Sequence, residues 1–302
     1  MSIRPSTFSG LILIALLTLC WGVNWPIMKV GLADIPVFTF RGSCVLFGGV
    51  GLLAIAWLAG GPVMPRRREV MPLIWLSLFN VLIWQVLSGY GVEWMAAGRA
   101  AVLAYTMPCW AVVLGALVLK ERIDWKRGMG LALGVLGMAL LVGDDLSAVG
   151  RAPLGAAFVL AAALAWAIGT VLAKRYRWEL PLSAMVGWQL LLSAPPMLAV
   201  AVVFEIDGIG AVGWPATWSL IYNMVFATLA AHWLWFRVLE LYPAGVASIS
   251  TLAIPVVGLF TGAALLGEPL GWLEIGALTL VVAALAAVHG DALRAALFAR
   301  AR

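Results

Sequence analysis

Charged side chains are scarce in this sequence. The 302 residues include 19 Lys or Arg and 14 Asp or Glu, or 11% of the chain. A soluble domain carries about 25% charged residues. Hydrophobic residues make up 64%, and the mean hydropathy is +1.04. So few charges cannot cover a surface that faces water, so we expect lipid to solvate most of the outside of the protein.

Residues that carry enzyme chemistry are also few. The three cysteines, Cys20, Cys44 and Cys109, fall in apolar segments without the spacing of a metal site, and we interpret them as reduced packing residues. The acidic side chains lie in loops or near helix ends, and there is no Gly-x-x-x-x-Gly-Lys phosphate loop. These absences disfavour a metal or other cofactor, direct use of ATP and an integral membrane enzyme. No repeated filter or ring of charge indicates an ion channel.

Long apolar runs are abundant, and a bilayer core needs about 20 apolar residues per helix. Ten stretches come near that length, at residues 9–28, 36–59, 71–91, 98–119, 128–143, 153–173, 183–204, 216–239, 244–266 and 272–289. The alternation of a β-barrel is absent, so the sequence predicts an all-α membrane protein with ten transmembrane helices. We expect no charge deep in these runs, because Arg41, Arg237 and Glu274 lie near predicted ends, where long side chains reach the interface.

The basic residues behind the net charge of +5 are unevenly distributed between the two sides of the predicted membrane. With the N-terminus in the cytoplasm, 15 of the 19 basic residues fall in cytoplasmic segments, and the others are Lys29, Arg41, Arg99 and Arg151. The positive-inside rule therefore predicts cytoplasmic N- and C-termini in a bacterial inner membrane, and no nucleic-acid partner. The first run resembles a signal peptide, but it has no small-residue cleavage site, so we expect an uncleaved first helix.

The two halves of the chain resemble each other. Residues 93–125 and 240–272 align at an offset of 147. The identical pairs are Glu93/Glu240, Ala97/Ala244, Gly98/Gly245, Pro108/Pro255, Leu119/Leu266, Glu121/Glu268 and Trp125/Trp272. The sequence thus predicts two five-helix repeats, residues 1–147 and 148–302. Five is odd, so the repeats would have inverted topology, a recurrent plan of secondary transporters with the substrate near the midplane.

These features resemble the EamA-type members of the drug/metabolite transporter superfamily. In each half, a first helix with Trp precedes a fourth helix whose proline is followed thirteen residues later by Glu: Pro108 to Glu121, and Pro255 to Glu268. A Gly-rich helix follows in both halves. Within the superfamily, the chain is most similar to YddG-type aromatic amino acid exporters. The resemblance implies ten helices, alternating access and amino acid export.

Asn24 is the polar residue of the first apolar run. On a helix it shares one face with Trp21, Trp25 and Met28. An Asn that faces lipid is costly, so we expect it to face protein or a water-filled cavity. Interhelical hydrogen bonding and cavity lining both fit. The residue that matches Trp25 in the second repeat is Thr170, a further candidate.

A polar stripe follows the third predicted helix, at spacings of 3, 4, 4 and 3 residues. Its members are Ser77, Asn80, Trp84, Ser88 and Gly91, with Gln85 beside them. Such spacings place the residues on one helical face. Packing alone does not require so many small or polar residues in line, so a substrate cavity is favoured over interhelical contacts.

The fourth and ninth predicted helices, which correspond in the two repeats, each contain a proline. Ser248, Thr251 and Pro255 share a face of the ninth predicted helix, and Tyr105 and Pro108 lie at the corresponding place on the fourth. A proline leaves the carbonyl four residues earlier without its usual donor, and in lipid that carbonyl must find a partner or line a cavity. Both prolines are candidate hinges, with a plain kink as the alternative.

His232 and the deep tryptophans complete the candidate site. His232 is the predicted intramembrane group that titrates near neutral pH, so it is a candidate for proton coupling, and a buried hydrogen-bonding role is the alternative. Trp21, Trp84, Trp166 and Trp235 lie deep enough to stack on an aromatic or cationic solute, although core packing also fits.

These candidates lead to a substrate hypothesis. Without a deep Lys or Arg, a phosphorylated substrate is disfavoured, and a neutral or zwitterionic solute remains. We predict a secondary transporter that exports amino acids with neutral or aromatic side chains, with broad selectivity because apolar contacts discriminate weakly. Other metabolites or lipophilic drugs are the alternative cargo. The expected partners are the small-molecule substrate and the lipid bilayer, a proton as coupling ion remains open, and ten helices suffice for a monomer.

Overall fold

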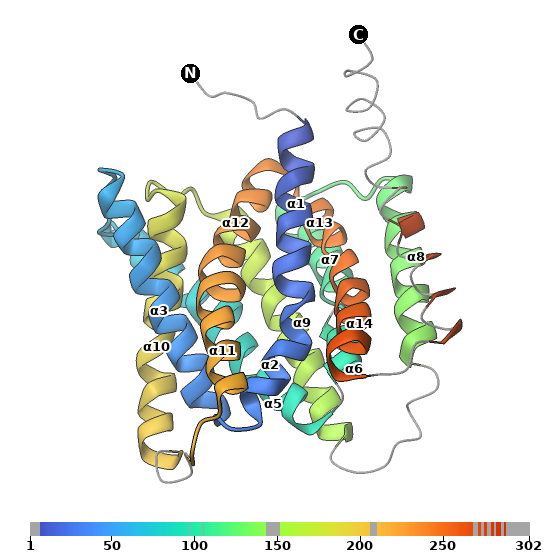
Figure 1. The fold of residues 1–302 in the computed structure, drawn as a ribbon. Helices are drawn as coiled ribbons and strands as arrows, with labels where there is room; N and C mark the ends of the chain where they lie inside the picture. Colours follow the sequence, from blue (N-terminus) through green and yellow to red (C-terminus); the bar gives the residue numbers. More distant parts are fainter. Residues whose placement is uncertain are drawn as a thin grey trace.

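The computed structural model describes residues 7–95, 97–104, 106–142, 152–205 and 210–267, together with short pieces between 271 and 287. Within these residues the chain is helical and contains no strand. The long helices stand side by side along one common direction (Figure 1).

Most spans consist of more than one helical segment, and η denotes a π-helix. The elements are α1 (Thr7–Gly22), α2 (Asn24–Leu32), α3 (Val37–Leu58), α4 (Arg67–Leu76), η1 (Ser77–Ile83), α5 (Trp84–Trp94), α6 (Ala97–Ala104), α7 (Met107–Leu119), α8 (Trp125–Val142), α9 (Ala152–Arg175), α10 (Leu182–Phe204), α11 (Trp214–Tyr222), η3 (Asn223–Ala230), α12 (Ala231–Leu241), α13 (Ala244–Ser250) and α14 (Ala253–Leu266).

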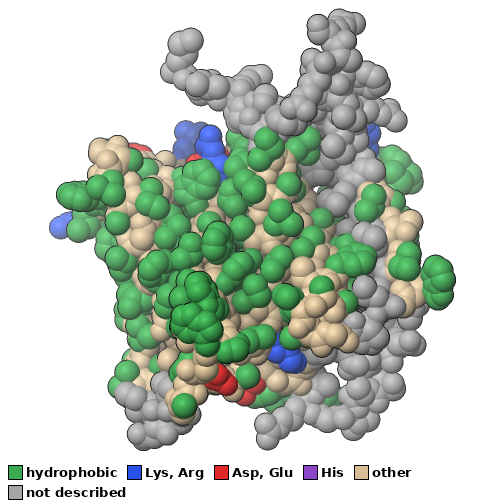
Figure 2. All heavy atoms as spheres, in the orientation of Figure 1, with side chains coloured by type: hydrophobic (Ala, Val, Ile, Leu, Met, Phe, Trp, Pro, Cys, Tyr) green, Lys and Arg blue, Asp and Glu red, His purple; other side chains and the backbone are tan. Residues whose placement is uncertain are grey.

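Seven helical stretches of the described residues are long and apolar enough to cross a membrane. They are Gly10–Leu32, Val37–Leu58, Arg67–Trp94, Pro153–Arg175, Leu182–Phe204, Trp214–Leu241 and Val246–Leu266. Each coincides with one of the ten predicted runs. Shorter apolar helices, Met107–Leu119 and Gly128–Gly137, fall in two more, and half of the tenth run lies outside the described residues. Hydrophobic side chains cover most of the described surface in Figure 2, as lipid requires.

Prolines interrupt three of the spans. The chain breaks between α1 and α2, between α6 and α7, and between α13 and α14. Each break lies just ahead of a proline: Pro26, Pro108 or Pro255. A proline cannot donate to the carbonyl four residues earlier, and those carbonyls lie where α1, α6 and α13 end. The disruption that the sequence predicts at Pro108 and Pro255 is present, whereas movement about these points stays a prediction.

Two spans contain a π-helical segment, in which backbone hydrogen bonds reach five residues instead of four. η1 covers 77–83, and adding the repeat offset of 147 gives 224–230, which is almost the whole of η3 (223–230). The two π segments therefore occupy equivalent positions in the two halves. Because a π segment puts more residues into each turn, a helical face at α-helical spacing does not continue across it.

Glycines bring α3 and α10 into close backbone contact. A Cβ at Gly49 would lie 2.7 Å from the backbone nitrogen of Leu191, and one at Gly187 would lie 3.0 Å from that of Leu53. Small residues of this kind let helices approach closely in lipid, where no hydrophobic force drives helices together. The glycines therefore set the distance between these two helices.

An acidic side chain at the end of α10 completes this helix pair. The Glu205 carboxylate accepts hydrogen bonds from the backbone N–H of Phe38 (2.9 Å) and Thr39 (2.7 Å), and from the Thr39 hydroxyl (2.8 Å). It thereby satisfies N–H groups in the first turn of α3, where a negative charge also favours the helix dipole. This contact fixes the start of the helix that bears Arg41.

The close contact at Gly49 predicts that the same Gly→Ala substitution has different effects on stability at two positions. Gly49→Ala should destabilise the protein by about 1–3 kcal/mol, the usual cost of overpacking, because the backbone of α10 cannot move aside as a flexible side chain can. Gly128→Ala in α8 is the matched control, since a Cβ there meets nothing within 4 Å. Thermal unfolding in detergent measures both. Equal melting temperatures for the two variants would contradict the close contact.

Candidate functional site

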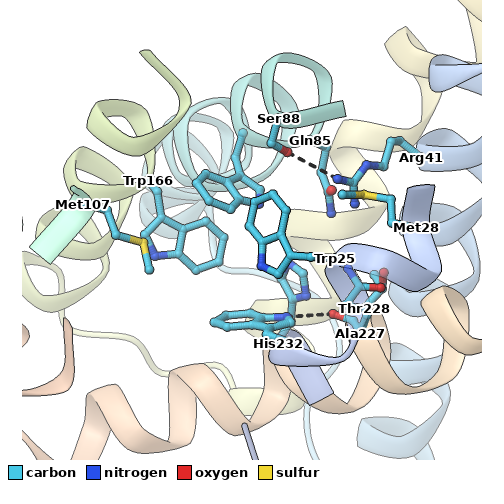
Figure 3. Close-up of a pocket in the computed structure, with 13 residues that line it drawn as sticks. Trp25, Met28, Arg41, Gln85, Ser88, Met107, Trp166, Ala227, Thr228 and His232 are labelled. Carbon is cyan, nitrogen blue, oxygen red and sulfur yellow. Dashed lines mark hydrogen bonds between the residues drawn. The ribbon is translucent and has the colours of Figure 1, made fainter. Parts of the chain in front are cut away.

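A cavity lies at the centre of the bundle, near the break between α1 and α2 (Figure 3). Its lining residues are Trp21, Asn24, Trp25, Met28, Arg41, Trp84, Gln85, Ser88, Met107, Trp166, Ala227, Thr228 and His232. They come from both halves of the chain. The volume of the cavity is about 40 Å³, which is room for a few waters. The cavity is therefore narrower than an amino acid.

Tryptophans form one wall of the cavity. Trp166 is the hub, with ring centroids 5.4 Å from Trp21, 5.0 Å from Trp84 and 5.8 Å from Trp235. Pairs at such separations contribute about 0.5–1.5 kcal/mol beyond their burial. The Trp21 indole N–H also donates to the Ala227 carbonyl at 2.9 Å. The wall is therefore held from both halves, and its rings offer flat apolar surface.

Polar atoms without partners converge on the same cavity. Those of the lining residues are Asn24 Oδ1, Arg41 Nε, Gln85 Oε1, Trp166 Nε1 and both ring nitrogens of His232, all buried and without a hydrogen bond to the described residues. An unsatisfied buried polar atom costs about 1–3 kcal/mol. Six of the ten such atoms among the described residues belong to this lining; the others are Asn80 Oδ1, Gln189 Oε1, Asn223 Oδ1 and Trp235 Nε1. The concentration of six at one place favours a site for a polar molecule.

Arg41 contradicts the expectation that no basic side chain lies deep. The sequence placed it near a helix end, with its side chain reaching the interface. It does lie in the first turns of α3, but it points inward, is 6% exposed and lines the cavity. One guanidinium nitrogen, Nη2, donates to Ser88 Oγ at 3.3 Å (Figure 3). Nearness to a helix end in the sequence does not say which way the side chain points.

The profile of the EamA-like transporter family matches residues 8–143 and, a second time, residues 153–289. This chain belongs to the EamA-like transporter family. It is accordingly a multi-pass membrane protein, and its family and its relatives' names indicate a transporter rather than an enzyme.

Several relatives match this EamA-like transporter over most of their length. It is 31% identical over 246 residues to "Uncharacterized transporter YoaV" of Bacillus subtilis, covering 81% of this chain and 84% of the relative. It is 27% identical over 282 residues to "Probable amino-acid metabolite efflux pump" of Escherichia coli, covering 91% and 92%. A solved crystal structure at 18% identity has the same fold, with a TM-score of 0.77 over 95% of this chain and 98% of that one.

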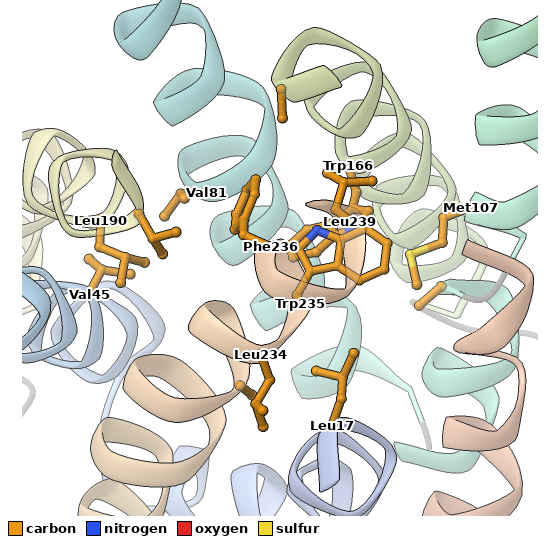
Figure 4. Packing of buried hydrophobic residues seen from close by; sticks show 14 of the residues in the cluster. Leu17, Val45, Val81, Met107, Trp166, Leu190, Leu234, Trp235, Phe236 and Leu239 are labelled. Atoms are coloured by element: carbon orange, nitrogen blue, oxygen red, sulfur yellow. The ribbon is translucent and has the colours of Figure 1, made fainter. Parts of the chain in front are cut away.

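The structure of this EamA-like transporter brings half of the predicted cavity residues together. Those that line the cavity are Trp21, Asn24, Trp84, Gln85, Ser88, Trp166 and His232. Trp235 lies behind the wall, fully buried against Trp166 (Figure 4). Tyr105 lies outside the described residues. The remaining candidates have other neighbours.

The polar stripe is divided by the π segment that it crosses. Ser77 Oγ donates to the Gln189 carbonyl at 2.8 Å and lies 2.7 Å from Ser193 Oγ, between helices. Asn80 Nδ2 donates to the Trp166 carbonyl at 3.3 Å. Beyond η1, Trp84, Gln85 and Ser88 line the cavity. The 3.6-residue spacing predicted one face, and the wider turn of η1 separates it into an interhelical part and a cavity part.

Other candidates support the cavity from behind. Thr170 Oγ1 donates at 2.9 Å to the Trp166 carbonyl, the one that Asn80 also reaches. Thr251 Oγ1 donates to the Ser248 carbonyl at 2.7 Å, beside the break between α13 and α14. The hydroxyl of Thr251 thus satisfies a carbonyl at that break. Thr170, Ser248 and Thr251 are buried without lining the described cavity.

Six lining residues were not among the predicted cavity residues. They are Trp25, Met28, Arg41, Met107, Ala227 and Thr228. Trp25 and Met28 share the Asn24 face, so that face could have been taken as a whole. Arg41 had the strongest signal, because a charge inside an apolar run is a functional-site candidate by default. Met107, Ala227 and Thr228 carry no pattern that separates them from packing residues.

Because η1 divides the polar stripe, we predict that two serines on the same span differ in their accessibility to water-soluble reagents. In a background without Cys20, Cys44 and Cys109, Ser88→Cys should react with a small water-soluble thiol reagent because it faces the cavity. Ser77→Cys should react much more slowly, since it is packed against α10. Mass spectrometry of labelled protein in liposomes measures both rates. Equal rates would show that the two positions share one face.

Proposed function

We propose that this chain is a secondary exporter of small zwitterionic solutes, chiefly amino acids with neutral or aromatic side chains. The observation that carries the proposal is a single cavity with an indole wall and converging unpartnered polar atoms. An amino acid needs both surfaces, because it has an apolar or aromatic side chain and two charged groups to solvate. The names of the relatives in Escherichia coli and Salmonella typhimurium, "Probable amino-acid metabolite efflux pump", support the same substrate class.

The transport path that we propose is alternating access between two inverted five-helix repeats, residues 1–147 and 148–302. Three observations support it. The family profile matches twice, the π segments lie at equivalent positions, and the spans that contain Pro108 and Pro255 are both interrupted. Substrate sites of inverted-repeat transporters lie between the repeats, and this cavity is lined from both halves. Ten helices, a monomer and an inner-membrane location with cytoplasmic termini complete the proposal.

Transport by the purified protein in liposomes tests the function. Labelled phenylalanine and leucine should move faster than lysine or aspartate, because an apolar and indole-lined wall solvates a neutral side chain better than a charged one. Transport confined to a lipophilic cation or a phosphorylated sugar, with no amino acid above empty liposomes, would refute the proposal.

The indole wall predicts the effect of a single substitution. Trp84→Ala should lower phenylalanine transport on the order of tenfold, because loss of an aromatic contact costs up to about 1.5 kcal/mol. Trp75→Ala is the matched control: it lies on the same span, and its side chain is exposed to lipid. The control should transport like the wild type. If both variants transport equally, the assigned wall is wrong.

His232 is the residue that we propose for proton coupling. It lines the cavity, its ring centroid lies 5.8 Å from that of Trp21, and neither ring nitrogen has a hydrogen-bond partner among the described residues. The alternative is a hydrogen bond from the ring to the solute. His232→Gln restores the residue found at Gln85 in the first repeat, so it should retain transport.

The pH dependence of His232→Gln separates the two roles. Uptake of labelled phenylalanine, with and without a pH gradient, measures it. If His232 carries the proton, the variant still moves phenylalanine down its gradient but no longer responds to pH. A variant with an unchanged pH response excludes coupling through His232.

A further inference from the structure

Among the described residues that line the cavity, Arg41 is the one permanent cation, and its surroundings point to a specific ligand group. Arg41 enters from α3 opposite Trp166 (Figure 3). Its stem runs past Gly89, where a Cβ would lie 3.7 Å from Arg41 Nε, at ordinary van der Waals distance. The Arg41 side chain is nine-tenths buried, and its one hydrogen bond to a described residue is that to Ser88. Its other donors remain available to the cavity.

No carboxylate of the described residues neutralises this guanidinium. None of the cavity-lining residues is acidic, and no described Asp or Glu lies within ion-pair distance of Arg41. Three glutamates accept hydrogen bonds from backbone N–H groups instead: Glu69 from Leu180, Glu121 from Ala244 and Glu205 from Thr39. An unpaired charge at this depth is costly, so it indicates a counter-ion that arrives with a ligand.

We infer that Arg41 binds the carboxylate of the transported solute, an inference that rests on the proposed function and specifies its substrate. A guanidinium presents donors in a planar fork that matches a carboxylate. The acceptor oxygens Asn24 Oδ1 and Gln85 Oε1 also lack partners and suit an ammonium group. The tryptophan wall then receives the side chain. Carboxylate recognition thus excludes decarboxylated amines and lipophilic cations, which Arg41 repels.

A phosphate group is the other anion that an arginine binds. A phosphate carries more charge than a carboxylate, and its sites commonly gather several cationic or N–H donors. The described lining contains one guanidinium and no Lys. A single cation balances a single carboxylate, so the carboxylate is the better match.

Four probes with one phenyl ring separate these possibilities. They are L-phenylalanine, 3-phenylpropanoate (no ammonium), phenethylamine (no carboxylate) and phenyl phosphate. Calorimetric titration of the purified protein measures binding. Wild type should bind the two carboxylates at least tenfold more tightly than phenethylamine or phenyl phosphate. Arg41→Gln should lose tenfold or more in affinity for both carboxylates, as expected when a charge-assisted bond in a buried site is removed. It should bind phenethylamine at least as tightly as the wild type, because the repelling charge is gone.

Two further variants serve as controls. Arg41→Lys keeps the charge and loses the fork, so its loss should be intermediate. Arg237→Gln removes an arginine that pairs with Glu240 outside the cavity, and it should bind all probes like the wild type. Melting temperatures show that each variant is folded, and Arg41→Lys serves as the test if Arg41→Gln does not fold.

The outcomes separate this inference from the function on which it rests. If Arg41→Gln binds and transports phenylalanine as wild type does, the inference fails and the exporter proposal stands. If wild type transports no amino acid but binds 3-phenylpropanoate through Arg41, the amino acid proposal fails and the carboxylate site stands. Equal wild-type binding of phenethylamine and phenylalanine, preferential binding of phenyl phosphate, or binding of none of the probes overturns the inference.

Discussion

Every polar group inside a bilayer needs a partner within the protein, because lipid supplies none. Much of this chain meets that demand locally. Glu205 satisfies the first turn of α3, and Thr170 and Asn80 both bond the Trp166 carbonyl. The lining residues with unpartnered atoms stand apart from this rule, and they meet around one cavity. In the proposed function, a polar solute would supply the partners that these lining atoms lack.

The tryptophan wall links that site to the rest of the bundle. Trp166 belongs to α9 of the second half, and it contacts Trp21 and Trp84 of the first half as well as Trp235 behind it. Its backbone is fixed through Asn80 and Thr170. A displacement of one half against the other must therefore reshape the wall itself. The rings that would contact a solute are the same rings that join the two halves.

Hydropathy predicts much of this fold because it follows from lipid solvation, which acts on composition along a whole span. Proline predicts the breaks at Pro108 and Pro255, because a missing N–H is a local property of the chain. The inward direction of Arg41 and the π segment at Ser77–Ile83 do not follow in this way. Both depend on which helices pack against them, and the π segment changes which face Trp84 shares with its neighbours. Half of the predicted cavity residues, accordingly, line the cavity, and others such as Ser77 and Thr251 support it or join helices.

Because the cavity is small, the interruptions in the spans bear on how a solute could enter it. A solute larger than a few waters can enter only if the walls separate, and separating intact helices would break backbone hydrogen bonds in lipid, where each lost bond is costly. At the breaks before Pro26, Pro108 and Pro255 the proline has no N–H for the carbonyl four residues earlier, so each break has one backbone bond fewer than an intact helix. If these points are hinges, as the sequence predicts for Pro108 and Pro255, the half-helices would tilt there at a lower cost than within an intact helix. Two of these breaks place lining residues next to them, Asn24 after the first and Met107 after the second, so tilting at either break would change the width of the cavity directly.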